Sequence, residues 1–356
     1  MHMSKKKPSF PISESLERYL LEYERSVNLP LSYDDLTNWF ESAAIYDAKG
    51  NDTLWESVIY HPTFQEEIER ALTFIYATLK TDGNMEVIEH LKVSRIDYCL
   101  FGNSKPFRVR LVNTLNDNHD YFYVKRADAS RVYGLELEHI LSPNRLDFIV
   151  DRGTLIEGHI PGIPGDVFLD YYTKTPNFAK SFAAKEFVKF NERCFVMLLG
   201  DMRAYNYVVD VTPDFDTEQY RVRAIDFDQI CYEGRKNHYL PQFYKENFPI
   251  VKFCMELLHP ATVKQYQYEE RTLMKRRYYM AQKRVKRLMN SMVKDTLSTK
   301  EKRKSLIKDL NAYHNTTKFT RLTSMGRILR LHMTLMLGKS KPKIDREKAT
   351  FRRKEK

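Results

Sequence analysis

The sequence predicts an α+β protein with two lobes, because its strand-like and helix-like segments are separated along the chain. Short runs rich in aromatic and β-branched residues gather in residues 95–160, whereas residues 161–338 are dominated by helical periodicity. An N-terminal segment, 1–94, has helical patterns and predicts a helical extension. The last residues, 339–356, are basic and without periodicity, which predicts a disordered tail.

Three helices are expected in the N-terminal segment. Ser13 is suited to cap the first, in which apolar residues recur every three or four positions. The second follows Ser32 and includes Trp39. Pro62 opens the third, which continues to a turn-forming stretch at 81–84.

The β-rich lobe is expected to begin as a three-stranded antiparallel meander. Its three runs lie within residues 95–127 and are separated by stretches rich in Gly, Asn, Ser and Pro. A short helix follows at 130–141. Residues 147–153 and 154–162 then predict a further hairpin, which runs into a connector rich in Pro and Gly at 161–165.

The helical lobe is expected to hold one β-hairpin among its helices. A helix is predicted over 178–198, and strand-like runs follow at 205–211 and 220–228. Almost every segment after Phe248 has helical periodicity. The clearest case is 274–292, where apolar residues alternate spacings of four and three with basic residues between them.

Charge is distributed unevenly along the chain. Residues 261–356 contain 28 Lys and Arg against 8 Asp and Glu, whereas residues 1–260 contain 30 against 39. A mildly acidic body therefore carries a strongly basic C-terminal third. Such asymmetry indicates attraction to a polyanion, which could be nucleic acid, an anionic membrane or an acidic protein.

The compartment is inferred from missing signals. No apolar run is long enough for a transmembrane helix, and the basic N-terminus lacks the apolar stretch of a signal peptide. The four cysteines are widely spaced and form no Cys-x-x-Cys pair. These features predict a cytoplasmic protein with free thiols.

Two segments place polar residues at the ends of strand-like runs. In the first, LLGDMRAYNYVVD, Asp201 and Asn206 are five residues apart with Arg203 between them. In the second, RVRAIDFDQ, Asp226 and Asp228 are two residues apart. Hard oxygen ligands of this kind suit Mg²⁺, which binds through one or two carboxylates together with substrate phosphates.

These segments resemble those of a known superfamily. The D-x-[KR]-x-x-N loop, the following hairpin and the Ile-Asp-Phe segment look like the catalytic loop and metal-binding Asp of protein kinases and aminoglycoside-type phosphotransferases. The resemblance covers about residues 95–260. It implies a bilobal kinase-like fold that binds ATP and Mg²⁺, with a small β-rich lobe and a helical lobe.

The resemblance also implies roles for the residues around the phosphates. Asp201 would be the catalytic base, and Arg203 falls where protein kinases carry a basic residue near the γ-phosphate. Asn206 would hold Mg²⁺ and orient Asp201. Asp226 would join Mg²⁺ to the nucleotide phosphates.

Further roles concern the nucleotide. Lys125 corresponds to the strand Lys that contacts the α- and β-phosphates, with Glu136 or Glu138 as its partner and Glu136 preferred. Gly102 is the single glycine of the phosphate loop. The backbone of Glu157–His159 would contact adenine.

Several residues depart from the family pattern. Leu199-Gly200 precedes Asp201, and Asp228 stands where the family has Gly after Asp-Phe. The expected function is transfer of the γ-phosphate of ATP to a hydroxyl of a protein or small molecule. The alternatives are a non-catalytic kinase-like scaffold and a polyanion- or nucleic-acid-binding protein that uses the basic helices of 261–356.

Overall fold

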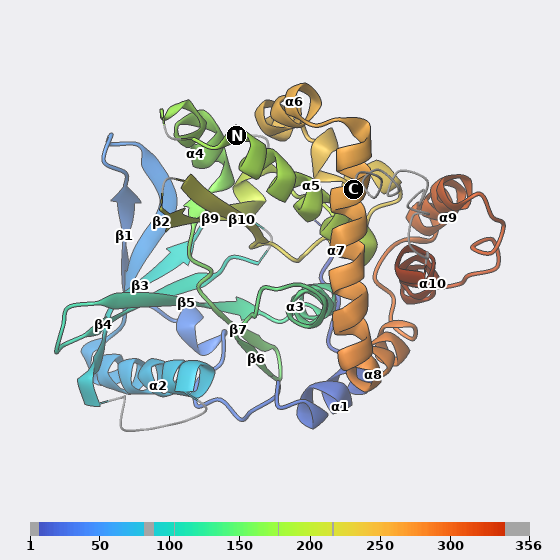
Figure 1. The fold of residues 1–356 in the computed structure, drawn as a ribbon. Helices are drawn as coiled ribbons and strands as arrows, with labels where there is room; N and C mark the ends of the chain where they lie inside the picture. The colour runs from blue at the N-terminus through green and yellow to red at the C-terminus, as the bar shows by residue number, and fades with distance from the viewer. Residues whose placement is uncertain (1–6, 82–88, 103, 177, 216, 339–356) are drawn as a thin grey trace, which may run out of the picture.

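A computed structural model describes residues 7–81, 89–102, 104–176, 178–215 and 217–338. It is an α+β structure whose largest element is a seven-stranded antiparallel sheet in the order β1-β2-β3-β4-β5-β7-β6 (Figure 1). The strands of this sheet are β1 (Glu41–Tyr46), β2 (Asp52–Ile59), β3 (Leu91–Cys99), β4 (Phe107–Asn113), β5 (His119–Arg126), β6 (Phe148–Asp151) and β7 (Thr154–Gly158).

The two faces of this sheet differ in polarity. On β4, Phe107, Val109 and Leu111 alternate with Arg108 and Arg110, as expected for a strand with one buried face. The apolar face packs against α2 (Pro62–Thr81) and forms one hydrophobic core (Figure 1). The opposite face therefore carries the polar side chains of the sheet.

The remaining helices form a second core with a small three-stranded sheet. That sheet has the order β10-β9-β8, with β8 (Ile163–Pro164), β9 (Tyr207–Asp214) and β10 (Thr217–Ala224). The helices are α1 (Glu14–Glu22), α3 (Ala129–Leu141), α4 (Gly165–Asp170), α5 (Lys180–Met197), α6 (Phe248–Leu257), α7 (Pro260–Met280), α8 (Gln282–Met292), α9 (Lys300–His314) and α10 (Met325–Gly338). Helix α3 is buried along almost its whole length and connects the large sheet to the helices.

Most predicted elements are present. Ser13 caps α1 by accepting a hydrogen bond from the Leu16 N–H at 3.3 Å, and α2 begins at Pro62. The meander, the hairpin β6–β7 and the hairpin β9–β10 are also as predicted. The long periodic segment at 274–292 is divided into α7 and α8 at Ala281.

The prediction that residues 1–94 form a helical extension is wrong in part. After Ser32 the chain makes only a short 3₁₀ turn, Asp35–Thr37, and then forms β1 and β2. Trp39 packs on Tyr98, with ring centroids 4.8 Å apart. Its apolar spacing therefore reflects aromatic contacts with the sheet.

Two further observations concern the C-terminal tail and the character of the helices. The predicted tail at 339–356 lies outside the described residues. Among the residues that are described, no helix combines the length and apolar character needed to cross a membrane.

Candidate active site

Lys125 lies on the polar face of β5, and its partner is Glu157 of the adjacent strand β7. The two side chains are buried, and Lys125 Nζ donates a hydrogen bond to Glu157 Oε2 at 2.9 Å. Burial lowers the pKa of Lys125, and nearby Arg131 lowers it further. Burial alone would raise the pKa of Glu157, but the charges of Arg131 and Lys125 lower it to about 2. Glu157 is therefore a buried carboxylate.

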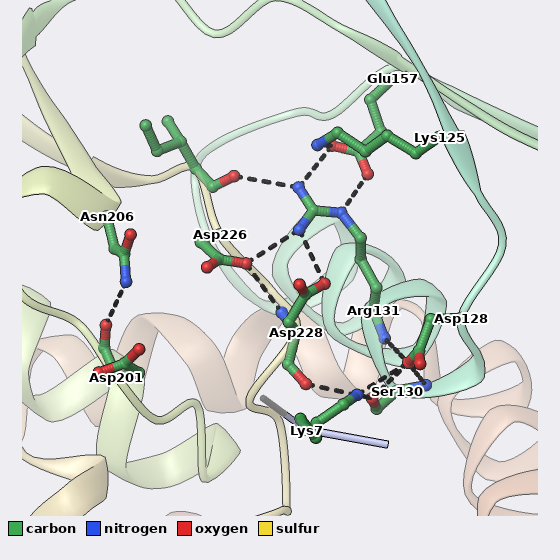
Figure 2. Close-up of polar contacts among 11 residues, drawn as sticks. Lys7, Lys125, Asp128, Ser130, Arg131, Glu157, Asp201, Asn206, Asp226 and Asp228 are labelled. Carbon is green, nitrogen blue, oxygen red and sulfur yellow. Dashed lines mark hydrogen bonds and ion pairs between the residues drawn. The ribbon is translucent and has the colours of Figure 1, made fainter. Parts of the chain in front are cut away.

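Arg131, in the first turn of α3, is the centre of the site (Figure 2). All five of its N–H groups have acceptors: Nε and Nη2 donate to Glu157, Nη2 also donates to the Ile225 carbonyl, and Nη1 donates to Asp226 and Asp228. Both Nη1 contacts are 2.9 Å long. A single buried guanidinium thus joins the large sheet to the segment after β10.

Sequence reasoning missed Arg131, although a signal was present. Cations are unfavourable at helix N-termini, because the macrodipole is positive there. A basic residue in the first turn of a helix therefore indicates that local carboxylates compensate its charge. Here Asp128 also caps the helix by accepting hydrogen bonds from the Ser130 and Arg131 N–H groups.

The predicted pairing of Lys125 with Glu136 is wrong. Glu136 is fully buried but faces away from the sheet, where it contacts Tyr19, Arg25 and Arg284. Glu136 follows Arg131 by five residues, so it points about 140° away around the helix. The alternative partner, Glu138, accepts a hydrogen bond from Asn144 at 2.9 Å.

Asp226 follows β10 and lies between Arg131 and the Asn206 segment (Figure 2). Its Oδ1 accepts hydrogen bonds from Arg131 Nη1 and from the Asp228 N–H. The Ile225 N–H donates to the Asn206 carbonyl at 3.0 Å, which brings the two segments together. Burial and the neighbouring Asp228 raise the pKa of Asp226 to about 6, although Arg131 opposes this shift.

Asn206 is oriented by the Asp201 loop. Its Nδ2 donates to the Asp201 carbonyl at 2.7 Å, which leaves its amide oxygen directed away from that carbonyl (Figure 2). Asp201 itself has a left-handed backbone conformation, with φ of 57°. Its N–H donates to the Tyr244 hydroxyl at 2.9 Å. These contacts fix both residues of the D-x-[KR]-x-x-N segment.

Arg203 is paired with two carboxylates. Its Nε donates to Asp201 Oδ1 at 2.9 Å, and its Nη1 donates to Glu246 at 2.8 Å. The pKa of Asp201 is raised by burial, although Arg203 acts in the opposite direction. Arg203 and Asp201 thus form a partly exposed ion pair beside Asn206.

The other predicted nucleotide contacts lie along the large sheet. Gly102, with φ of 83°, lies in the turn between β3 and β4, and Phe107 at the start of β4 pairs with Val124 beside Lys125. Strand β7 is paired on both sides, so the Glu157 backbone lies inside the sheet, contrary to the predicted backbone contact with a ligand. The His159 ring lies 3.3 Å from the Tyr123 hydroxyl.

Cavities and metal-ligand groups give no further guide to this site. A cavity of about 930 Å³ lies between α2 and residues 30–38 on the other face of the sheet. Within the described ranges, no three His, Cys, Asp or Glu side chains are grouped as metal ligands. No protein-family model matches the sequence, and a comparison with curated proteins gives no significant match.

Proposed function

We propose that the chain is a kinase-like phosphotransferase that transfers the γ-phosphate of ATP to a hydroxyl group. One observation carries the proposal: Arg131 joins the Lys125–Glu157 pair directly to Asp226, and Asn206 is bonded to the residue before Asp226. Phosphoryl transfer depends on positioned positive charge around the phosphates and a carboxylate at the acceptor. Strands β5 and β7, the first turn of α3 and the segments that contain Asn206 and Asp226 thus come together despite their separation in sequence.

The order of the elements supports the same proposal. A β-hairpin, a strand with Lys125, a helix, a second hairpin and a connector precede the Asp201 loop. The hairpin β9–β10 then separates that loop from Asp226. This is the order that the resemblance implies for a bilobal kinase-like fold, although a helix Glu is replaced by Glu157 of a strand.

The side chains present are compatible with Mg²⁺ and the nucleotide phosphates. Among the described residues, Asp226 Oδ2 and Asn206 Oδ1 accept no hydrogen bond, and both are hard oxygen donors. They would hold the metal, while Lys125 would bind phosphate oxygens. Bound Mg²⁺ would supply positive charge at the transferred phosphate.

Asp201 is the candidate base for the acceptor hydroxyl. Its raised pKa makes its carboxylate more basic than an exposed Asp. Arg203 would orient it through their 2.9 Å contact. The four free cysteines suit a reducing compartment, so we place the reaction in the cytoplasm.

Thermal unfolding with and without Mg-ATP tests the nucleotide site. A ligand at about 100 times its Kd stabilises the folded state by about 2.7 kcal/mol, so the midpoint should rise with Mg-ATP. Asp226→Asn should abolish the Mg²⁺-dependent part of the rise. Asp210→Asn removes a half-buried carboxylate from β9 and is the matched control, which should respond like the wild type. An unchanged wild-type midpoint at saturating Mg-ATP would reject the proposal.

A second candidate function is a non-catalytic kinase-like scaffold. It is favoured by Arg131, whose guanidinium already neutralises Asp226 and Asp228. Release of ADP in the presence of candidate acceptors distinguishes the two functions. A midpoint that rises with nucleotide, without any Asp201-dependent turnover, would support the scaffold.

A further inference from the structure

Three helices near the C-terminus surround a hollow of about 240 Å³ that is separate from the candidate active site. Helices α7, α8 and α10 contact one another there (Figure 1). Its apolar side consists of Met289, Met333 and Leu337, all of which are buried. Its polar lining includes Lys275 of α7 and Arg330 of α10.

Tyrosines form another part of this lining. The rings of Tyr278 and Tyr279 are nearly perpendicular, at 88°, with centroids 5.8 Å apart. Tyr279 is 60% exposed, which is unusual for a large ring beside a hollow. A flat group that entered the hollow could therefore stack on tyrosine above a thioether-rich surface.

The charge around the hollow has one sign. Residues 271–294 contain nine Lys and Arg and no Asp or Glu, and residues 318–338 contain four and none. Some of these cations form ion pairs within the protein; Arg284, for example, pairs with Glu136. Within the described part of the chain, Lys275 and Arg330 have no ion pair with an acidic side chain, and the Arg330 guanidinium donates a hydrogen bond to the neutral Asn290.

Two further cations extend this surface. Lys286 lies one turn after Gln282 on α8, and Arg327 lies one turn before Arg330 on α10. Both are exposed, and neither forms an ion pair within the described residues. The cations thus come from three helices: Lys275 and Arg330 line the hollow, and Lys286 and Arg327 each lie one helical turn from a lining residue.

We infer that this hollow binds single-stranded nucleic acid, with a base entering beside Tyr279 and phosphates on Lys275 and Arg330. A nucleic acid carries one negative phosphate on every nucleotide. This regular spacing of charge suits cations that come from three different helices. A stacking surface with cations around it accepts any base, because every base has a flat face. A membrane is a poorer partner, since the surface is hollowed where membrane insertion needs protruding apolar groups.

Fluorescence anisotropy with a labelled 12-nucleotide RNA of mixed sequence tests the inference on the full-length protein. Tyr279→Ala should weaken binding about fivefold or more, as stacking contributes about 1–3 kcal/mol per base. Tyr171→Ala, which removes a ring that is 64% exposed elsewhere, is the matched control and should bind like the wild type.

The charged contacts have their own readout in the salt dependence. Lys275→Gln with Arg330→Gln should reduce the slope of log Kobs against log salt by about 1.4, because each lost phosphate contact on a single strand contributes about 0.7. Lys300→Gln with Lys304→Gln makes the same charge change on exposed positions of α9 and should leave the slope unchanged.

Each alternative result would overturn the inference. Equal losses in the two double variants would mean that net charge alone attracts the RNA. Full competition by a 12-residue poly-glutamate would assign the surface to an acidic protein. Binding to phosphatidylserine vesicles that depends on Tyr279, without RNA binding, would assign it to a membrane.

Discussion

Arg131 determines how charge is balanced at the candidate active site. It is a buried cation beside the three carboxylates of Glu157, Asp226 and Asp228. Their attraction raises the pKa of Arg131 well above its ordinary value, although burial alone would lower it. The geometry depends on the planar guanidinium, because five donors in fixed directions meet five separate acceptors.

Replacing Arg131 should therefore destabilise the fold even when the charge is kept. Arg131→Ala leaves three carboxylates with Lys125 alone and should lower the free energy of unfolding by about 3–5 kcal/mol. Arg131→Lys keeps the charge but offers at most three donors, so its loss should be intermediate. Urea denaturation measures both variants. Equal stability of Arg131→Lys and the wild type would show that charge alone matters.

Helix α3 shows which parts of the site the sequence could predict. The sequence predicts the helix at 130–141 and places Lys125 in a strand-like run, and both are present. The residue that faces Lys125 could not be predicted, because it depends on where the helix begins. Asp128 caps α3 three residues after Lys125, so Arg131 meets the sheet and Glu136 is turned away. The role of Glu157 depends on the pairing of β7 with β5, which is a contact between distant segments.

The helix predicted after Ser32 was wrong for a different reason. The spacing of Leu36 and Trp39 fits a helix, but their contacts are with the sheet. The stretch at 47–51, which contains Gly and Asn, separates β1 from β2 and was a usable hairpin signal. Local periodicity alone could not decide between these two structures.

Gly134 allows α3 to lie directly against the Asp226–Asp228 segment. A Cβ at this position would lie 2.9 Å from Phe227 Cβ and 3.1 Å from the Phe227 carbonyl oxygen. Gly134→Ala should push the helix away, which would cost about 1–3 kcal/mol of stability and weaken the Mg-ATP response. Gly153→Ala introduces a methyl group with no neighbour within 4 Å and is the control. Thermal unfolding with and without Mg-ATP checks both effects, and a Gly134→Ala protein indistinguishable from this control would contradict the tight packing.

Across the whole molecule, Glu136 connects segments from both ends of the chain. Its Oε1 accepts hydrogen bonds from the Tyr19 hydroxyl of α1 and from Arg284 Nε of α8. Arg25 Nε lies 3.5 Å from its Oε2. The mildly acidic body and the basic C-terminal third are thus joined by a buried carboxylate between two arginines. Surface ion pairs contribute little to stability, but removing one partner of a buried group leaves charge uncompensated.

Glu136→Gln should therefore loosen several segments at once. Arg25 and Arg284 would keep their charges without a buried carboxylate, at a cost of about 3–5 kcal/mol. Hydrogen exchange should become faster in α1, α3 and α8 together, since all three meet at this carboxylate. Glu14→Gln changes the same charge at an exposed position of α1 and should leave exchange unchanged. Faster exchange confined to α3 would mean that the N-terminal helix and the basic helices are held to the body by apolar packing instead.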